Sequence, residues 1–217
     1  MIAMVRTLRE ATAFDRARLA GPAPAAAVAL LGALLRRREP DGSWSVVRIV
    51  ETEAYREDDP ASHSAAGRTR RTAPMFGAPG TAYVYRSYGI HWCLNVAAEP
   101  AGTGAAVLLR AAAVLRGDHH LRPRRAAARR DEELLRGPGR LCQALEVTAP
   151  EHDGRDLLDL GQPLHLADDG YRPGAGDVVS GPRVGVRLAA DVPWRFVLRD
   201  VPEVSGYRRH PRAQRSA

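Results

Sequence analysis

The spacing of hydrophobic residues in the first part of the chain predicts a helix followed by a strand. Residues 24–38 combine an apolar face with arginines near the C-terminal end, where cations suit the helix dipole, and they predict a helix. A turn is expected at 40–42, which reads Pro-Asp-Gly. Residues 43–54 are rich in β-branched residues and predict a strand that leads into a polar loop at 55–64. The Gly-, Pro- and Arg-rich stretch 65–80 predicts irregular structure.

The middle of the chain predicts a β-hairpin and a buried strand. Residues 81–96 contain two segments rich in aromatic and β-branched residues, TAYVYR and IHWCLNV, with Ser-Tyr-Gly between them. Residues 105–115 form a long apolar stretch that is interrupted only by Arg110. We expect a hairpin beside a central strand.

The remaining pattern predicts a mixed α+β fold. Residues 118–146 are expected to be helical, with Gly-Pro-Gly at 137–139 separating two segments. After residue 161, short apolar pieces between Gly and Pro predict strands that end with WRFVLRD. We expect one domain over 1–217, with a largely antiparallel curved sheet, flanking helices and a protruding hairpin, and a flexible tail at 206–217.

Composition favours a polyanion-binding protein. The formal net charge is +7, and because the chain contains no lysine, all 32 basic residues are arginines. Heavy use of Ala, Arg, Gly and Pro throughout weakens the argument from charge alone. No apolar run approaches the length of a membrane span, and the charged N-terminus does not resemble a signal peptide, so a cytoplasmic location is expected. Cys93 and Cys142 are expected to be buried thiols.

Two carboxylates and a phenol are predicted to share one face of the strand at 43–54 and its continuation. Alternation places Glu51, Glu53 and Tyr55 on the same side. A carboxylate at a strand end beside a loop histidine, here His63, can act as a general base on water. Carboxylates on strands are more often solvated or paired with arginine, and spacing alone favours that interpretation. Arg110 could bridge to either glutamate or help hold a water, and the sequence gives both equal weight.

The predicted hairpin carries a cluster of aromatic residues. Tyr83 and Tyr85 fall on one strand face, whereas Tyr88 lies in the turn next to Gly89, where a large side chain has nothing to pack against. An apolar wedge on a hairpin tip can enter the minor groove and unstack bases. Core packing is the ordinary explanation for the neighbouring Trp92 and Cys93, but it explains Tyr88 poorly.

The surroundings of this hairpin contain no acidic residue between positions 61 and 98. Such a stretch with aromatics interleaved is expected of a surface that contacts a phosphate backbone. The residues predicted to contact DNA are Tyr83, Tyr88, Gly89, Ile90, Arg68, Arg70, Arg71 and Arg86. A metal site is not expected, because Asp118, His119 and His120 are adjacent and have no third ligand at suitable spacing.

Taken together, these segments resemble the alkyladenine (3-methyladenine, alkylpurine) DNA glycosylase family, and the likeness covers nearly the whole chain. It looks like a bacterial member without the long N-terminal extension of animal members. The resemblance rests on RIVETEAY at 48–55, ASHS at 61–64, MFGAPGTAYVY at 75–85, YG at 88–89, NV at 95–96, VLLRA at 107–111, GPGRLCQAL at 137–145, GPRVGV at 181–186 and PWRFVL at 193–198.

The resemblance implies that some residues of the site catalyse the reaction and others bind the base. Glu53 matches the family's general base, and Arg110 matches the arginine that helps to hold the nucleophilic water, with the backbone carbonyl of Val184 as a further contact. The residues that match those binding the flipped base are Tyr55, Tyr85, His63 and Asn95. In this scheme Asn95 discriminates against the exocyclic amine of normal guanine.

The resemblance also implies that Tyr88 fills the space left by the flipped nucleotide. Ile90 and His91 depart from some relatives, in which these positions are bulkier or aromatic, so the depth of insertion is in question. The loop from Tyr55 to His63 is slightly shorter than in animal members. These departures bear on the range of substrates and not on the reaction.

The sequence therefore predicts a monofunctional, monomeric DNA glycosylase of base excision repair that acts on nucleoid DNA. It would flip alkylated purines (3-methyladenine, 7-methylguanine, with hypoxanthine or ethenoadenine as further candidates) from duplex DNA and hydrolyse the N-glycosidic bond. Glycosylases that also cut the strand use an amine, and without lysine only the amine of Met1 remains, so water is the expected nucleophile and no cofactor is expected. The alternatives are a non-catalytic minor-groove DNA-binding protein, and a nucleosidase or RNA-binding domain that shares the fold.

Overall fold

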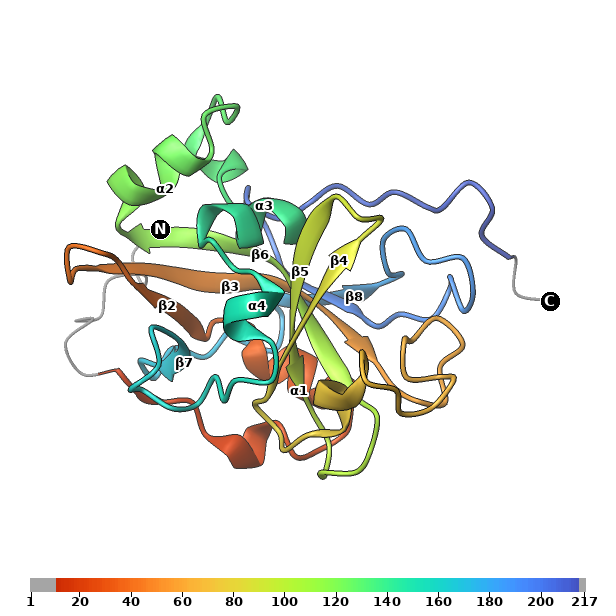
Figure 1. Cartoon of the computed structure of the whole chain (residues 1–217). Coiled ribbons are helices and arrows are strands. Elements are labelled where there is room, and N and C mark those ends of the chain that lie inside the picture. The colour runs from red at the N-terminus through yellow and green to blue at the C-terminus, as the bar shows by residue number, and fades with distance from the viewer. Residues whose placement is uncertain (1–10, 215–217) are drawn as a thin grey trace.

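The computed structural model describes residues 11–214, and the N-terminal stretch and the last three residues of the expected tail lie outside this range. The fold is built on one antiparallel sheet with strand order β1-β7-β2-β3-β6-β5-β4, in which β9 pairs with β3 and β8 pairs with β9. Figure 1 shows the long central strands crossing the molecule. The strands are β1 (Thr12–Ala13), β2 (Leu34–Arg38), β3 (Trp44–Tyr55), β4 (Ala82–Ser87), β5 (His91–Ala97), β6 (Ala106–Arg116), β7 (Leu164–Asp168), β8 (Val178–Gly181) and β9 (Arg195–Leu198).

Short helices cover one face of the sheet and enclose the main core. They are α1 (Ala23–Leu30), α2 (Asp118–Arg124), α3 (Pro138–Ala144) and α4 (Ala149–His152). Helix α1 packs on β3 and β6, α3 packs on β5 and β6, and α4 packs on β4. Thr52 faces this side and donates to the carbonyl of Ala27 over 2.9 Å. The predicted α+β fold with a curved antiparallel sheet and flanking helices is confirmed, and the opposite face of β3 is left for polar residues.

Strands β3 and β6 form the centre of the sheet, and each contains an extra residue. Ile49 lies opposite Ala112 but Glu51 lies opposite Ala111, so Val50 is unpaired in the ladder. The next step, from Glu51 to Thr52, skips Arg110 on β6. Bulges of this kind re-aim side chains and are common next to active sites. Here the bulge in β6 falls on Arg110, the only charged residue in the interior of that strand.

The prediction of a helix over 24–38 is wrong in its second half. Helix α1 ends at Leu30, and the arginines at its expected C-terminal end belong to strand β2. The chain turns at Gly32, whose φ of +85° lies in the left-handed region, and a Cβ there would lie 2.5 Å from the ring of Tyr171. Glycine is the residue that adopts this conformation at no steric cost, so the helix stops before it.

The other predicted elements are found with adjusted bounds. The strand at 43–54, the hairpin at 81–96 and the strand at 105–115 correspond to β3, β4–β5 and β6. Within 118–146 only α2, α3 and a 3₁₀ turn at Asp131–Glu133 are helical, so the break is longer than Gly-Pro-Gly alone. The stretch 65–80 is irregular except for a 3₁₀ turn at Ala73–Phe76.

The chain beyond β9 runs without regular structure to the last described residue (Figure 1). Its flexibility, expected from position 206 onward, stays a prediction. The N–H of Gln214 donates to the carbonyl of Arg187 over 2.9 Å, so the described part of this tail contacts the loop that precedes β9. Among residues 11–214 no helix is long and apolar enough to cross a membrane.

Candidate active site

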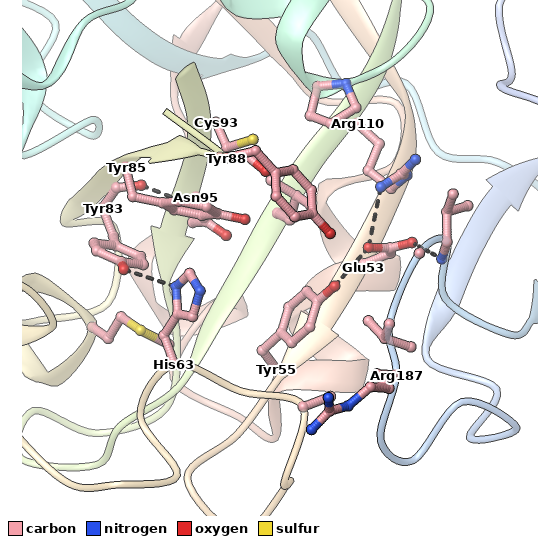
Figure 2. Close-up of a pocket in the computed structure, with 18 of the residues that line it drawn as sticks. Glu53, Tyr55, His63, Tyr83, Tyr85, Tyr88, Cys93, Asn95, Arg110 and Arg187 are labelled. Atoms are coloured by element: carbon pink, nitrogen blue, oxygen red, sulfur yellow. Dashed lines mark hydrogen bonds and ion pairs between the residues drawn. The ribbon is translucent and has the colours of Figure 1, made fainter. Parts of the chain in front are cut away.

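A cavity of about 730 Å³ opens on the sheet face that the helices leave free. Its floor comes from β3 and β6, one wall comes from the β4–β5 hairpin, and another comes from the loop at 184–188. Figure 2 shows side chains from all three converging on it. The predicted residues that line this cavity are Glu53, Tyr55, His63, Tyr83, Tyr85, Tyr88, Asn95, Arg110, Val184, Arg71 and Arg86.

Glu53 lies at the floor of the cavity and is fully buried. Its Oε2 accepts hydrogen bonds from the hydroxyl of Tyr55 over 2.8 Å and from Nη1 of Arg110 over 3.3 Å. Its Oε1 accepts from the backbone N–H of Val184 over 2.7 Å. A buried carboxylate with three donors is held in one orientation. At Val184 the described contact is made by the N–H, and a role for its carbonyl stays a prediction.

Arg110 bridges the two glutamates that the sequence offered as alternative partners. Its Nε donates to Oε1 of Glu51 over 2.8 Å while its Nη1 contacts Glu53. Burial alone would lower the pKa of Arg110, but the two carboxylates outweigh it and raise the pKa above its usual value. The guanidinium therefore stays charged beside Glu53.

Glu51 is fully buried behind Arg110 and accepts four hydrogen bonds. The donors are Nε of Arg110, Nε of Arg195 at 2.7 Å, and both the N–H and the hydroxyl of Ser205 at 2.8 Å. Burial would raise the pKa of Glu51, yet Arg110 and Arg195 hold it below the usual value. Arg195 and Ser205 had no recognisable signal in the sequence, because their role depends on where β9 and the chain after it return to β3.

Aromatic side chains form the hairpin wall of the cavity. Tyr83 and Tyr85 stack with ring centroids 5.4 Å apart, and His63 meets the Tyr85 ring edge-on at 4.5 Å. Nδ1 of His63 shares a hydrogen bond of 2.9 Å with the hydroxyl of Tyr83. Burial lowers the pKa of His63, and Arg71 adds to the effect, so the imidazole is neutral at pH 7. Burial also raises the pKa of Tyr83 to about 12.

Tyr55 faces the cavity, and an arginine that sequence reasoning missed covers its ring. The guanidinium of Arg183 lies 4.7 Å from the centroid of the Tyr55 ring and is fully buried. It forms an ion pair with Asp59 and donates to the carbonyl of Ala54 over 3.0 Å. Since Arg183 directly precedes Val184, the same residue supports both the ring and the loop that contacts Glu53.

Asn95 is buried in the same wall, and its amide nitrogen donates to the carbonyl of Tyr83 over 3.0 Å. A carbonyl only accepts, so this bond fixes the orientation of the side-chain amide. The amide oxygen is therefore not used on Tyr83 and is available to a molecule in the cavity.

The hairpin tip presents two apolar side chains to solvent. Tyr88 is 84% exposed and Ile90 is 66% exposed. Tyr88 and Gly89 have φ values of 49° and 69°, and the N–H of Ile90 donates to the carbonyl of Ser87 over 2.9 Å. Two successive residues with positive φ form a tight hairpin turn that favours Asn or Gly, so a tyrosine here carries backbone strain. Strain of this kind is common at functional sites.

The four predicted arginines are all exposed, but they do not share one position. Arg71 and Arg86 line the cavity, whereas Arg68 and Arg70 do not. None of the four pairs with a carboxylate within residues 11–214. Arg187 and His210 also line the cavity and are basic residues that were not predicted. The acid-free stretch after Gly206 was the only signal that could have pointed to His210.

Comparison with known proteins gives one consistent result. The model of the methylpurine-DNA glycosylase family matches residues 17–202. A protein of Nocardia farcinica is 48% identical over 200 residues, covering 89% of this chain and 91% of that protein. A protein of Granulibacter bethesdensis is 51% identical over 170 residues, covering 77% of each chain, and one of Mycobacterium bovis is 47% identical over 196 residues, covering 87% of this chain and 91% of that protein. All three carry the name "Putative 3-methyladenine DNA glycosylase". The chain belongs to the methylpurine-DNA glycosylase family.

Proposed function

We propose that this protein is a monofunctional DNA glycosylase that hydrolyses the N-glycosidic bond of an alkylated purine flipped out of duplex DNA. The observation that carries the proposal is the position of Glu53, a fully buried carboxylate at the floor of an aromatic-walled cavity, held by three donors. Enzymes that act on a base inside a duplex must first extrude it into a pocket and read it by stacking and hydrogen bonding. The cavity of about 730 Å³ lies in the range of ligand pockets.

The walls of the cavity suit an electron-poor purine. Tyr55 and Tyr85 would stack on the flipped base, and a cationic base gains about 0.5–2 kcal/mol from each aromatic face. The neutral imidazole of His63 brings no positive charge against such a base. The names of the relatives support 3-methyladenine as a substrate, and 7-methylguanine shares its positive charge. Neutral lesions such as hypoxanthine and ethenoadenine forgo the cation–π contribution and would be poorer substrates.

Asn95 would discriminate against the exocyclic amine of normal guanine, and 7-methylguanine, which carries the same amine, would offset this penalty through its positive charge. The amide of Asn95 is fixed by the bond to the carbonyl of Tyr83, so it cannot rotate freely away from an additional exocyclic amine. A pocket with a fixed polar group rejects ligands that leave it unpaired or that clash with it.

In the reaction, Glu53 would orient and deprotonate the attacking water, and its charge would stabilise the oxocarbenium-like transition state. Arg110 would hold the same water and keep Glu53 in place. An alkylated purine that is already cationic needs no further activation as a leaving group. The nucleophile would be water, because the chain has no lysine that could form a Schiff base with the sugar.

Tyr88 would occupy the space in the stack that the flipped nucleotide vacates. Its side chain is 84% exposed on a tight turn, so packing among residues 11–214 does not account for its size. Arg71 and Arg86 at the rim of the cavity, with Arg68 and Arg70 nearby in sequence, would contact phosphates. That the protein acts as a monomer stays a prediction.

The proposal is tested by incubating the purified protein with methylated duplex DNA and identifying the released bases by chromatography. Release of 3-methyladenine, together with the absence of a borohydride-trapped adduct between protein and DNA, is the expected result. A trapped adduct would overturn the assignment of water as the nucleophile. Binding of the duplex without release of any base would instead favour the non-catalytic minor-groove protein.

A further inference from the structure

The chain beyond β9 approaches the cavity although it lies past the end of the family match at residue 202. We call residues 205–214 the C-terminal segment. It begins at Ser205, which bonds to Glu51, and it ends where Gln214 donates to the carbonyl of Arg187. In Figure 1 it is the dark blue trace that leads toward the C-terminus.

Ser205, Arg208 and Gln214 anchor the C-terminal segment beside the catalytic residues, Gln214 through its bond to the carbonyl of Arg187. Ser205 holds Glu51, the buried partner of Arg110, through two bonds of 2.8 Å. The carbonyl of Arg208 accepts from the N–H of Gly185 over 3.1 Å, one residue after the contact of Val184 with Glu53. The C-terminal segment is therefore part of the wall of the site.

Two of the three arginines in the C-terminal segment have no carboxylate partner among residues 11–214. The C-terminal segment contains no acidic residue, and of its three arginines only Arg209 forms an ion pair, with Asp191. Arg208 and Arg212 are exposed, and no carboxylate in the described part of the chain pairs with either. Guanidinium groups that face solvent at the edge of a nucleic-acid pocket are suited to bind phosphate oxygens in a planar, two-pronged contact.

His210 brings a hydrogen-bond donor to the same edge. Its side chain lines the cavity, and its Nδ1 accepts from the backbone N–H of Arg212 over 3.0 Å. In the neutral ring that bond places the hydrogen on Nε2, which has no partner among residues 11–214. An oxygen acceptor that enters the cavity mouth can take this hydrogen bond.

We propose that the C-terminal segment is a phosphate-binding edge of the lesion pocket, in which Arg208, Arg212 and His210 bind the backbone of the strand that carries the flipped nucleotide. The inference rests on the proposed function, because a flipped nucleotide brings its flanking phosphates to the mouth of the cavity. It assigns DNA contacts to a part of the chain that lies outside the family match.

The first test measures binding of a synthetic duplex with one tetrahydrofuran abasic-site analogue over a range of salt concentrations. The variant Arg208→Gln/Arg212→Gln is compared with the control Arg38→Gln/Arg116→Gln. The control removes two exposed arginines that pair with no carboxylate among residues 11–214 and that lie at the C-terminal ends of β2 and β6. Each lost phosphate contact reduces the slope of the logarithm of the binding constant against the logarithm of the salt concentration by about one. This slope should therefore fall by about two in Arg208→Gln/Arg212→Gln and stay unchanged in the control. Equal slopes for the two variants would overturn the proposal.

The second test separates the hydrogen bond of His210 from its bulk. His210→Ala removes the donor, whereas His210→Gln places an amide N–H close to the position of Nε2. We expect His210→Ala to raise the KM for methylated duplex about tenfold with little change in kcat. His210→Gln should have a KM close to that of wild type. Equal KM values for wild type and His210→Ala, or a loss confined to kcat, would remove His210 from the phosphate-binding edge.

The two hypotheses fail in different ways. If the wild-type protein releases no base, the proposed function fails, and the salt-dependence measurement still tests the C-terminal segment because it needs only binding. If base is released but the slopes do not differ, the C-terminal segment alone is refuted.

Discussion

The hydroxyl of Tyr55 donates to Oε2 of Glu53 over 2.8 Å, so the ring proposed to stack on the base is bonded to the carboxylate proposed to activate water. Burial raises the pKa of Tyr55 well above its usual value, and Glu53 adds to the effect, so the phenol keeps its proton and acts as the donor. Recognition of the base and positioning of the catalytic group therefore depend on one side chain.

This relationship predicts that Tyr55→Phe slows catalysis without weakening stacking. The variant keeps the ring but removes a hydrogen bond to a charged acceptor, worth about 1.5–3 kcal/mol, so single-turnover release should fall about tenfold or more for every base. Tyr85→Phe is the matched control, because no hydrogen bond links Tyr85 to Glu53. Equal rates for the two variants would show that the Tyr55 hydroxyl is not needed.

The buried pair of Arg183 and Asp59 predicts a non-additive loss of stability. Arg183→Met leaves the Asp59 carboxylate buried without its partner, and breaking such a pair costs about 3–5 kcal/mol of the free energy of unfolding. Urea denaturation should show a smaller loss for Arg183→Met/Asp59→Asn than for Arg183→Met alone. Additive losses would mean that the two side chains do not act as a pair.

We expect Tyr88 to lower the stability of the folded protein and to be required for base release from duplex DNA. Asparagine adopts the left-handed conformation more readily than tyrosine, so Tyr88→Asn should leave the melting temperature unchanged or raise it. Release of 7-methylguanine from duplex should fall about tenfold, while release from single strands, which have no stack to fill, should change little. The control Ile90→Asn alters the same tip, and an equal loss in that variant would contradict a specific role for Tyr88.

The lowered pKa of His63 predicts acid sensitivity in both activity and stability. As pH falls through this lowered value, the ring gains a charge that repels a cationic base, so release of 7-methylguanine should fall more steeply in wild type than in His63→Gln. In the unfolded chain His63 binds a proton near pH 6.5, whereas in the folded protein its pKa is lower. Because the unfolded state then binds more protons, the free energy of unfolding decreases as the pH drops below about 6.5. Parallel pH profiles for both proteins would contradict the assignment.

The sequence predicted the central strands and the hairpin because these stretches are long and rich in apolar, β-branched and aromatic residues. It failed at 31–38, where alanines and leucines fit a helix as well as a strand, and where Gly32 turns the chain against Tyr171. That contact joins segments far apart in sequence, and no local pattern encodes it.

Most of the predicted site residues line one cavity, but the contacts that hold them could not be derived from spacing. Arg110 reaches both glutamates because it occupies a bulge in β6, and a bulge depends on how two strands pair. Arg183 has a buried position that its Gly- and Pro-rich surroundings did not indicate. His210 lies in a tail that was expected to be flexible, and the bonds of Arg208 and Gln214 to the 185–187 loop hold this tail beside the cavity.

The central claim is that the Glu53 carboxylate drives hydrolysis, and it is tested most directly by the single-turnover rate of base release from methylated duplex for wild type and Glu53→Gln. Binding of the abasic-analogue duplex by both proteins serves as the control for folding and affinity. We predict that Glu53→Gln releases base about 10²–10⁴ times more slowly while its affinity for the duplex is retained. A rate within tenfold of wild type would contradict the account and would leave Glu53 as a structural partner of Arg110.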